Sequence, residues 1–388
     1  MTELREEVYK YTWNDEVDVG SDHENHNNNE REICYNIRGL TEDEIPAWTE
    51  FCASVFAYKP NPPPPSYFAR HYTNDPTRKA SLIRVAFTKN GSMVASCRLF
   101  LRRISNGAGA SLSAGGIGEV CTDKHHRRRG LSKVLLQNVL DIMRERKLQV
   151  SLLHAAPLFF QVYEKAGGYV NSTSRWSLIT SHRTYQTNLN KIHNNKHNAQ
   201  YSVRLADFPN DTESLSRLHR IYSEQQFAGC VVRSQEYWND YLSVELEGSL
   251  WVLVKEQQKQ QEVIVAWLSI RSRGDKFQLQ EFGIDANHIT TNKALVTLLT
   301  HAIQQQQAAK TTSTTTMTFS FSVPTVVLDQ LRSEEQKDPN LESMFDWSSE
   351  TSDDDLGWMY KILEDGGVTI DSIDGTTASH LIWPSDSF

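Results

Sequence analysis

The sequence lacks any apolar run long enough to cross a membrane. A transmembrane helix needs about 20 predominantly apolar residues, and no such stretch occurs among the 388 residues. Residues 1–7 are mainly polar and acidic, without the apolar segment of a secretory signal. We therefore expect a soluble, cytoplasmic protein with no membrane partner.

Cysteine is also scarce, and its spacing argues against two kinds of site. The 5 cysteines are odd in number, widely separated and free of Cys-x-x-Cys spacing: Cys34, Cys52, Cys97, Cys121 and Cys230. A disulfide framework or a zinc site needs paired or clustered cysteines. We therefore expect neither a disulfide framework nor a metal site, and a reducing compartment.

An excess of positive charge is missing as well. The formal net charge is -8, whereas general nucleic-acid binders carry surplus Lys and Arg that neutralise phosphates. This balance argues against a nucleic-acid partner and suits a cationic substrate.

The length and composition predict two domains. A chain of 388 residues, 39% of them hydrophobic, exceeds what one compact core usually serves. Residues 1–32 are polar and low in complexity, which predicts a disordered or loosely docked leader. We expect an α/β domain at 33–180, a linker rich in Asn, His and Lys at 181–200, and a second α/β domain at 201–388.

Within the first domain, turn and cap signals separate the expected strands and helices. Residues 41–44 match a capping box that opens a helix. Five prolines within residues 59–65 predict a loop at the border of a substrate cleft. Asn90-Gly91 predicts a hairpin. The second domain repeats the order of elements without the basic turn described next, which predicts a degenerate duplicate.

The functional prediction depends on the stretch 115–168. A β-prone segment at 117–122 passes through a basic turn containing Gly130 into an amphipathic helix at 131–143, and a strand follows at 150–153. This order predicts a βαβ unit with parallel strands in a mixed sheet. The turn brings free backbone N–H groups to a helix N-terminus, an arrangement that binds phosphate.

Arg127-x-x-Gly130-x-Ser132 resembles motif A of the GNAT superfamily of acetyl-CoA-dependent N-acetyltransferases, whose consensus is Arg/Gln-x-x-Gly-x-Gly/Ala. The one departure is Ser132, a small residue in place of Gly or Ala. The resemblance implies a GNAT fold that holds acetyl-CoA between the strand 117–122 and the turn. The cofactor-binding residues it implies are Val120, Cys121, Thr122, Arg127, Arg128, Arg129, Gly130, Leu131 and Ser132.

The catalytic candidates come from the same resemblance and from acid–base chemistry. Tyr163, in Tyr163-x-x-x-Gly167, matches the tyrosine that protonates the coenzyme A thiolate in many GNAT enzymes. The alternative is a tyrosine that only packs on the sheet. Glu119 is a candidate for the base that deprotonates the amine, but a carboxylate in a central strand is costly unless it faces a cleft or is paired. A structural role for Glu119 therefore stays open, and His154 is a second candidate.

The last residue is a third candidate for the base. Residues 126–131 resemble the motif of the Eis-type acetyltransferases, in which the carboxylate of a C-terminal Phe reaches the active site, and this chain ends in Phe388. The layout and the tail also resemble the fungal lysine N6-acetyltransferases of lysine catabolism. Phe388 could instead be a hydrophobic anchor that holds the tail in place.

The resemblance implies one leading function and leaves two alternatives. The leading hypothesis is transfer of the acetyl group of acetyl-CoA to a small cationic amine, most specifically free lysine. Val120 or Thr122 would supply an N–H for the oxyanion, and Glu281 or Asp285 would hold the charge of the amine. The alternatives are a protein or histone lysine acetyltransferase and a non-catalytic acyl-CoA-binding protein. The sequence leaves the acceptor, the base and the oligomeric state open.

Overall fold

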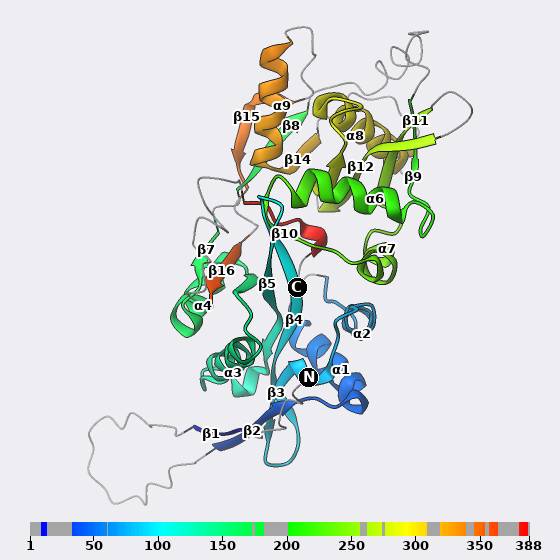
Figure 1. Cartoon of the computed structure of the whole chain (residues 1–388). Helices are drawn as coiled ribbons and strands as arrows, with labels where there is room; N and C mark the ends of the chain where they lie inside the picture. The colour runs from blue at the N-terminus through cyan, green and yellow to red at the C-terminus, as the bar shows by residue number, and fades with distance from the viewer. Residues whose placement is uncertain are drawn as a thin grey trace, which may run out of the picture.

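Two β-sheets with flanking helices make up the fold of the computed structural model (Figure 1). The structure describes residues 9–13, 33–59, 61–172, 175–181, 201–256, 262–273, 276–308, 319–338, 345–353, 357–363 and 380–386. The first sheet occupies the lower half of Figure 1 and the second sheet the upper half. The mixed α/β class that we predicted is confirmed.

The first sheet has the strand order β1-β2-β3-β4-β5-β6-β16-β7, and β10 also pairs with β4. Its strands are β1 (Tyr9–Trp13), β2 (Ile33–Gly39), β3 (Ile83–Thr88), β4 (Met93–Asn106), β5 (Ser111–Thr122), β6 (Val150–His154), β7 (Val170–Asn171), β10 (Ala228–Val231) and β16 (Trp358–Ile362). The helices beside it are α1 (Ile45–Phe56), α2 (Pro65–Thr73), α3 (Leu131–Glu145) and α4 (Phe160–Gly167). β5 and β6 are parallel, as the predicted crossover through α3 requires.

Local signals explain several boundaries in this half. Gly91, with a φ of 82°, forms the predicted turn between β3 and β4. The backbone N–H and the hydroxyl of Thr41 both donate to the Glu44 carboxylate at 3.0 Å, just before α1. The proline-rich segment is shorter as a loop than predicted, because α2 begins at Pro65. Proline fits the first helical position, where its missing N–H has no partner to lose.

For residues 9–13 the disordered alternative is wrong and the docked one holds. These residues form β1, which pairs antiparallel with β2 along its whole length. The segment Tyr9–Trp13 is rich in aromatic and β-branched residues, which fit a pleated strand. The rest of the leader and nearly all of the predicted linker lie outside the described residues.

The second sheet has the order β15-β8-β14-β13-β12-β11-β9. Its strands are β8 (Trp176–Ser181), β9 (Tyr201–Leu205), β11 (Leu250–Glu256), β12 (Glu262–Arg273), β13 (Lys276–Ile284), β14 (Phe319–Pro324) and β15 (Asp346–Ser352). The helices of this half are α6 (Thr212–His219), α7 (Ser243–Glu245), α8 (Thr291–Ala308) and α9 (Thr325–Lys337). The unit β13–α8–β14 repeats the parallel crossover of β5–α3–β6. The predicted duplicate is therefore confirmed.

Strand pairing does not follow the predicted sequence boundaries. β8 begins within 33–180 and ends at Ser181 but belongs to the second sheet, whereas β10 and β16 fall within 201–388 but belong to the first. β16 pairs with β6 from Trp358 to Ile362 and so covers an edge that would otherwise be open. Each half of the chain therefore contributes strands to both sheets.

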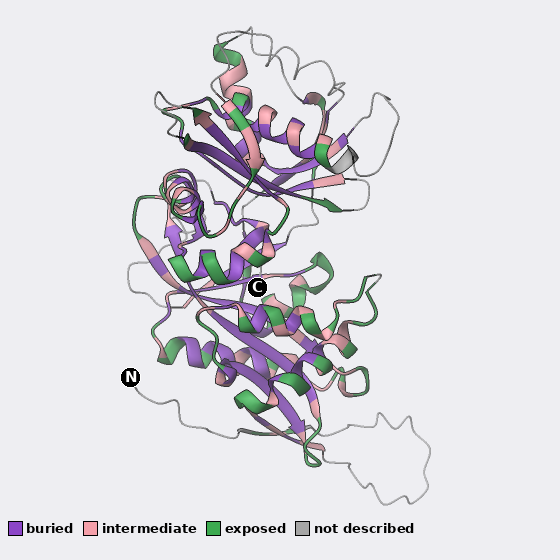
Figure 2. Cartoon of the chain, turned by 90° about the vertical axis from the view of Figure 1, so that its right-hand side faces the viewer, coloured by how far each residue is buried: buried purple, intermediate pink, exposed green. Residues whose placement is uncertain are grey.

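The cores lie between the sheets and the helices that cover them. In Figure 2 the strands are mostly buried, while the helices expose one side. α3 illustrates the arrangement, since Leu135, Val139 and Met143 are fully buried at helical spacing while Lys133 is exposed. This packing fixes the start of α3 at the end of β5.

Candidate active site

β5 and β6 pair in parallel from Ala114 to Ile117 of β5 and from Val150 to Leu153 of β6. Their register ends with Ile117 opposite Leu153, one residue before β6 stops, while β5 continues to Thr122. Among the described strands, none pairs with residues 118–122 on that side. The backbone groups on this edge of β5 are therefore available to an extended ligand.

A β-bulge lies at the start of this unpaired stretch. Between two regular pairs of β4 and β5, Cys97 alone lies opposite Glu119 and Val120. Glu119 has a φ of 52°, in the left-handed region that residues with a Cβ seldom adopt. Bulges redirect side chains, and here the Glu119 carboxylate points toward Arg98.

The basic turn connects β5 to α3 and leaves its own N–H groups free. Arg128 and Gly130 have φ values of 63° and 70°, and α3 begins at Leu131. Within the described part of the chain, the backbone N–H groups of Arg128, Arg129 and Gly130 donate to no acceptor. Together with the first N–H groups of α3 they form an anion site, to which the helix dipole adds positive potential.

The side chains of the predicted cofactor-binding set have different surroundings. Arg127 and Arg128 are exposed beside the turn. Arg129 donates to the Tyr35 hydroxyl at 2.8 Å. The Cys121 thiol is buried, 4.0 Å from that of Cys52. Arg129 and Cys121 can therefore offer backbone groups to a ligand, whereas the two exposed arginines can also offer their guanidinium groups.

The remaining members of that set join the strand to the helix. The hydroxyl oxygens of Thr122 and Ser132 lie 3.2 Å apart, so they link the end of β5 to the first turn of α3. Val120 is half-buried and packs on the first core, and Leu131 is fully buried in it. These contacts hold the turn and the bulge in a fixed relation.

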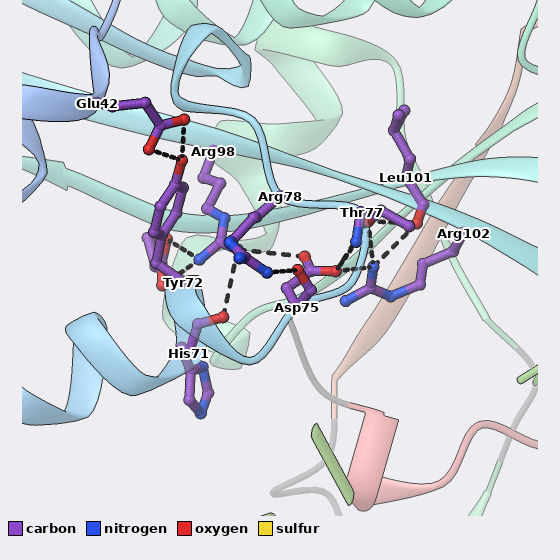
Figure 3. A network of polar contacts seen from close by, with 10 residues as sticks. Glu42, His71, Tyr72, Asp75, Thr77, Arg78, Arg98, Leu101 and Arg102 are labelled. Carbon is purple, nitrogen blue, oxygen red and sulfur yellow. Dashed lines mark hydrogen bonds and ion pairs between the residues drawn. The ribbon is translucent and has the colours of Figure 1, made fainter. Parts of the chain in front are cut away.

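The Glu119 carboxylate lies at one end of a buried network of charges. Arg98 donates to its two oxygens at 3.3 and 3.4 Å, and the same guanidinium lies 3.2 Å from Asp75. Asp75 also accepts from Arg102 at 3.0 Å (Figure 3). Burial raises the pKa of Glu119, and Arg98 only partly opposes this shift. A carboxylate with a raised pKa is a stronger base than an ordinary glutamate.

Tyr163 lies in the middle of α4 and packs on the first core. Its ring is 6.2 Å from that of Tyr169, in an edge-to-face arrangement. Burial, followed by the nearby Cys97 thiol, raises the pKa of Tyr163. Cys97 is the residue opposite the bulge, so the two features lie close together. The hydroxyl therefore stays protonated at neutral pH, as a proton donor must.

His154, the other side-chain candidate for the base, ends β6. Its ring packs 5.1 Å from that of Trp358 on β16. Burial lowers the pKa of His154 to about 4, so the ring is neutral at pH 7. Its Nε2 is buried and has no hydrogen-bond partner in the described residues. A neutral imidazole with a free nitrogen is chemically able to accept a proton.

The tail before Phe388 is anchored between the two sheets. Leu381, Ile382 and Trp383 are fully buried, and the Trp383 indole donates to Ser223 at 2.9 Å. Phe388 itself lies outside the described residues, so the predicted return of its carboxylate to the active site stays a prediction.

The prediction that Glu281 or Asp285 holds the amine is wrong. Glu281 is fully buried and accepts from Arg233 at 2.6 Å. Asp285 pairs with Arg217 at 2.8 Å. Both carboxylates are therefore already neutralised by arginines within the C-terminal half, which the sequence pattern did not reveal.

Residues 36–170 match the family model for the acetyltransferase (GNAT) domain. This part of the chain is a GNAT acetyltransferase domain. The chain accordingly carries an acyl-CoA-dependent N-acetyltransferase domain. No curated protein matches the sequence significantly.

Solved structures share the fold of nearly the whole chain. A GCN5-related N-acetyltransferase from Anabaena variabilis has a TM-score of 0.56 at 13% identity, over 85% of this chain and 73% of that one. Eis1 from Mycobacterium abscessus has a TM-score of 0.50 at 12% identity, over 85% and 73%. The Saccharomyces cerevisiae N-myristoyltransferase, solved with myristoyl-CoA and inhibitors, has a TM-score of 0.51 at 13% identity, over 89% and 87%. At such identities the likeness shows the fold alone.

The GNAT domain fits an acyl-CoA, and the duplicate half does not. In the GNAT domain the start of α3 carries free N–H groups beside exposed arginines. At the corresponding start of α8, the N–H groups of Thr291 and Asn292 donate to the Glu334 carboxylate at 3.0 and 2.8 Å. A carboxylate of the chain therefore takes the place that a phosphate would need.

Neither a membrane-crossing helix nor a metal-binding cluster is found in the described ranges. No helix there is long and apolar enough to span a bilayer. No group of three or more His, Cys, Asp and Glu side chains there is arranged to hold a metal ion.

The sequence did not predict the buried charged residues that contact Glu119 or lie next to it. Asp75 and Arg98 lie in separate elements and meet only in the folded chain. One signal was present, because Arg98 and Arg102 are charged residues at even spacing in β4 and so point to the same face of the strand. Charges on the buried face of a strand imply a buried counter-ion.

Proposed function

We propose that the GNAT domain acetylates the side-chain amine of a small cationic acceptor, with free lysine as the preferred one. The observation that carries the proposal is the closure of the acceptor side of Glu119 by the C-terminal half. The His71 ring of α2 lies 5.8 Å from that of Tyr241, and the Arg102 guanidinium lies 5.1 Å from the centre of the Tyr237 ring. Packing of the C-terminal half against the elements beside Glu119 suits a small acceptor better than a segment of a folded protein.

In the proposed reaction Glu119 accepts a proton from the acceptor ammonium. The neutral amine then attacks the thioester carbonyl of acetyl-CoA, and a backbone N–H of Val120 or Thr122 stabilises the oxyanion. The C–S bond breaks, and Tyr163 donates its proton to the departing thiolate. The turn 127–132 holds the pyrophosphate throughout.

Two features support Glu119 as the base. Its raised pKa suits proton abstraction near neutral pH, and Arg98 fixes the carboxylate in one position. His154 and the carboxylate of Phe388 are the alternative bases. Each is tested by a variant that leaves Glu119 in place.

The proposal is tested by turnover of acetyl-CoA with a panel of acceptors. Purified protein is mixed with lysine, a polyamine, an aminoglycoside or a histone peptide, and free thiol and acetylated product are measured. We expect the highest kcat/KM with lysine. If only the histone peptide is acetylated, the small-molecule hypothesis is ruled out. Coenzyme A binding without any turnover would indicate a non-catalytic protein.

A conservative variant tests the proposed acid. Tyr163→Phe should lower kcat about 100-fold or more, the usual contribution of a positioned acid, with little change in the KM for acetyl-CoA. Tyr201→Phe is the matched control, because Tyr201 lies on β9 of the second sheet and donates to the His288 carbonyl. Equal activity of both variants would remove Tyr163 from the chemistry.

A further inference from the structure

A cluster of charged and aromatic side chains lies where the C-terminal half covers α2. Its members come from α2, from the segment that ends in α7, and from β12: Tyr67, Arg70, His71, Tyr241, Glu245 and Arg271. We call these six residues the head-group cluster. No role was predicted for any of them from the sequence, and none takes part in the proposed proton transfers.

The cluster centres on a single carboxylate with two half-exposed arginines. Glu245 lies 2.8 Å from Arg271 and 3.7 Å from Arg70. Both arginine side chains are 46% exposed, while Glu245 is 16% exposed. Although burial acts in the opposite sense, the contacts with His71 and Arg271 lower the pKa of Glu245 to about 2. Two guanidinium groups therefore face one carboxylate, which leaves an excess of positive charge.

A buried polar atom in the cluster lacks a partner. His71 is only 5% exposed, and its Nε2 makes no hydrogen bond within the described residues. The nearest carboxylate oxygen, on Glu245, is 3.8 Å away, which is too long for a hydrogen bond. Buried polar atoms are nearly always satisfied by protein, water or ligand. The ring packs against that of Tyr67 in a tilted arrangement, with centroids 4.2 Å apart and 37° between the planes, which restricts its orientation.

The cluster is adjacent to Glu119. One guanidinium, that of Arg98, donates both to the Glu119 carboxylate at 3.3 Å and to the backbone carbonyl of His71 at 3.4 Å. Burial, followed by the charges of Glu245 and Glu119, raises the pKa of Tyr67 to about 12. The Tyr67 hydroxyl is therefore within electrostatic reach of both carboxylates.

We infer that the head-group cluster binds the zwitterionic head of an α-amino acid whose side-chain amine is acetylated at Glu119. Arg70 and Arg271, which are half-exposed, pair with the α-carboxylate in place of Glu245, and the released Glu245 holds the α-ammonium. Arginine suits the first task because its planar fork matches a carboxylate. This inference rests on the proposed function, and it adds that the acceptor must carry a carboxylate.

Three acceptors that differ by one group each test the inference. Cadaverine is lysine without its carboxylate, and 6-aminohexanoate is lysine without its α-amine. We expect kcat/KM for both to be at least about tenfold below that for L-lysine, since tenfold corresponds to about 1.4 kcal/mol, within the range of one charge-assisted hydrogen bond. Equal values for lysine and cadaverine would overturn the inference and leave amine acetylation intact.

Single substitutions assign the two charges. Arg271→Gln should raise the KM for lysine about tenfold, keep kcat nearly constant and leave cadaverine unaffected. Glu245→Gln should weaken lysine and cadaverine but spare 6-aminohexanoate. Arg144→Gln is the matched control, because Arg144 is also 46% exposed and paired with a carboxylate, that of Asp141 on α3. An equal effect of Arg271→Gln on lysine and cadaverine would refute the assignment.

A binding measurement separates the inference from the proposed function. If no amine of the panel is acetylated, the proposed function fails. Calorimetric titration of lysine into the protein with coenzyme A then decides the inference by itself. Binding that Arg271→Gln weakens supports the head-group cluster, and the absence of lysine binding overturns it.

Discussion

Arg233 bridges two buried carboxylates, and its removal should destabilise the protein strongly. The side chain is fully buried and lies 2.6 Å from Glu281 on β13 and 2.8 Å from Asp386 in the tail. It also donates to Ser385 at 3.1 Å. One cation therefore contacts two buried carboxylates and joins the tail to the second sheet.

The magnitude can be reached by two routes. Removing one partner of a buried ion pair costs about 3–5 kcal/mol, because the other charge stays buried without compensation. Independently, although burial alone would raise it, Arg233 and His219 lower the pKa of Glu281 from 4.5 to about 2. This lowering corresponds to roughly 3 kcal/mol, which Arg233 and His219 share, with no discount for solvent because Glu281 is fully buried. The two routes agree.

The sign of the pH dependence follows from the lowered pKa of Glu281. Its contribution to stability is fully present above about pH 4.5 and is lost as the pH falls toward 2. Asp386 acts in the opposite sense, because burial raises its pKa despite Arg233. We therefore expect Arg233→Met to cost about 3 kcal/mol at pH 7, at the lower end of the range, and to reduce the loss of stability on acidification.

Urea unfolding followed by circular dichroism and tryptophan fluorescence measures this cost, provided that the slope with denaturant is unchanged. Arg204→Met is the matched control, since Arg204 pairs with Asp211 at 2.6 Å but is 39% exposed. A pair of that kind contributes about 1 kcal/mol or less. If Arg233→Met costs no more than the control, the buried network does not hold the tail.

Three further outcomes are expected. Gly130→Ala should weaken the binding of coenzyme A about tenfold in a titration. The φ of 70° costs a residue with a Cβ about 1–2 kcal/mol, and the new Cβ would lie 2.7 Å from the Tyr11 hydroxyl. Unchanged affinity would contradict the role of the turn. Because burial raises the pKa of Glu119, kcat/KM should be lost as the pH falls through a value above 4.5, and Glu119→Gln should remove this limb from the pH profile. Deleting Phe388 should leave kcat within about twofold, because Glu119 is the proposed base; a loss of kcat with an unchanged melting temperature would transfer the role of base to the C-terminal carboxylate.

The parts of the site that depend on local sequence were predictable. Gly130 needs its left-handed φ, the helix after it needs an apolar face, and both requirements show in adjacent letters. The sheet order around them follows from the chirality of the crossover. For the same reason the duplicate half was visible as a repeated order of elements.

The charge networks were not predictable, because their members lie far apart in the sequence. Arg98 and Asp75 are separated by 23 positions, and Arg233 and Asp386 by 153. Local sequence propensities carry no information about such a pairing. Glu281 was therefore predicted to be available to a ligand, although it is bound by Arg233. The return of β16 to the first sheet is hidden for a similar reason, since a short apolar strand fits either sheet equally well.

In the proposed mechanism the GNAT domain binds acetyl-CoA, and the C-terminal half contributes to binding of the acceptor. The free N–H groups at the start of α3 and the bulge at Glu119 belong to the GNAT domain, whereas Glu334 fills the equivalent place in the duplicate. The duplicate half instead supplies Glu245 and Arg271 to the acceptor side. If this division holds, substitutions at these two residues change the choice of acceptor without changing the KM for acetyl-CoA. A rise in that KM in Arg271→Gln, measured at saturating lysine, would show that acceptor choice and acetyl-CoA binding are not separate.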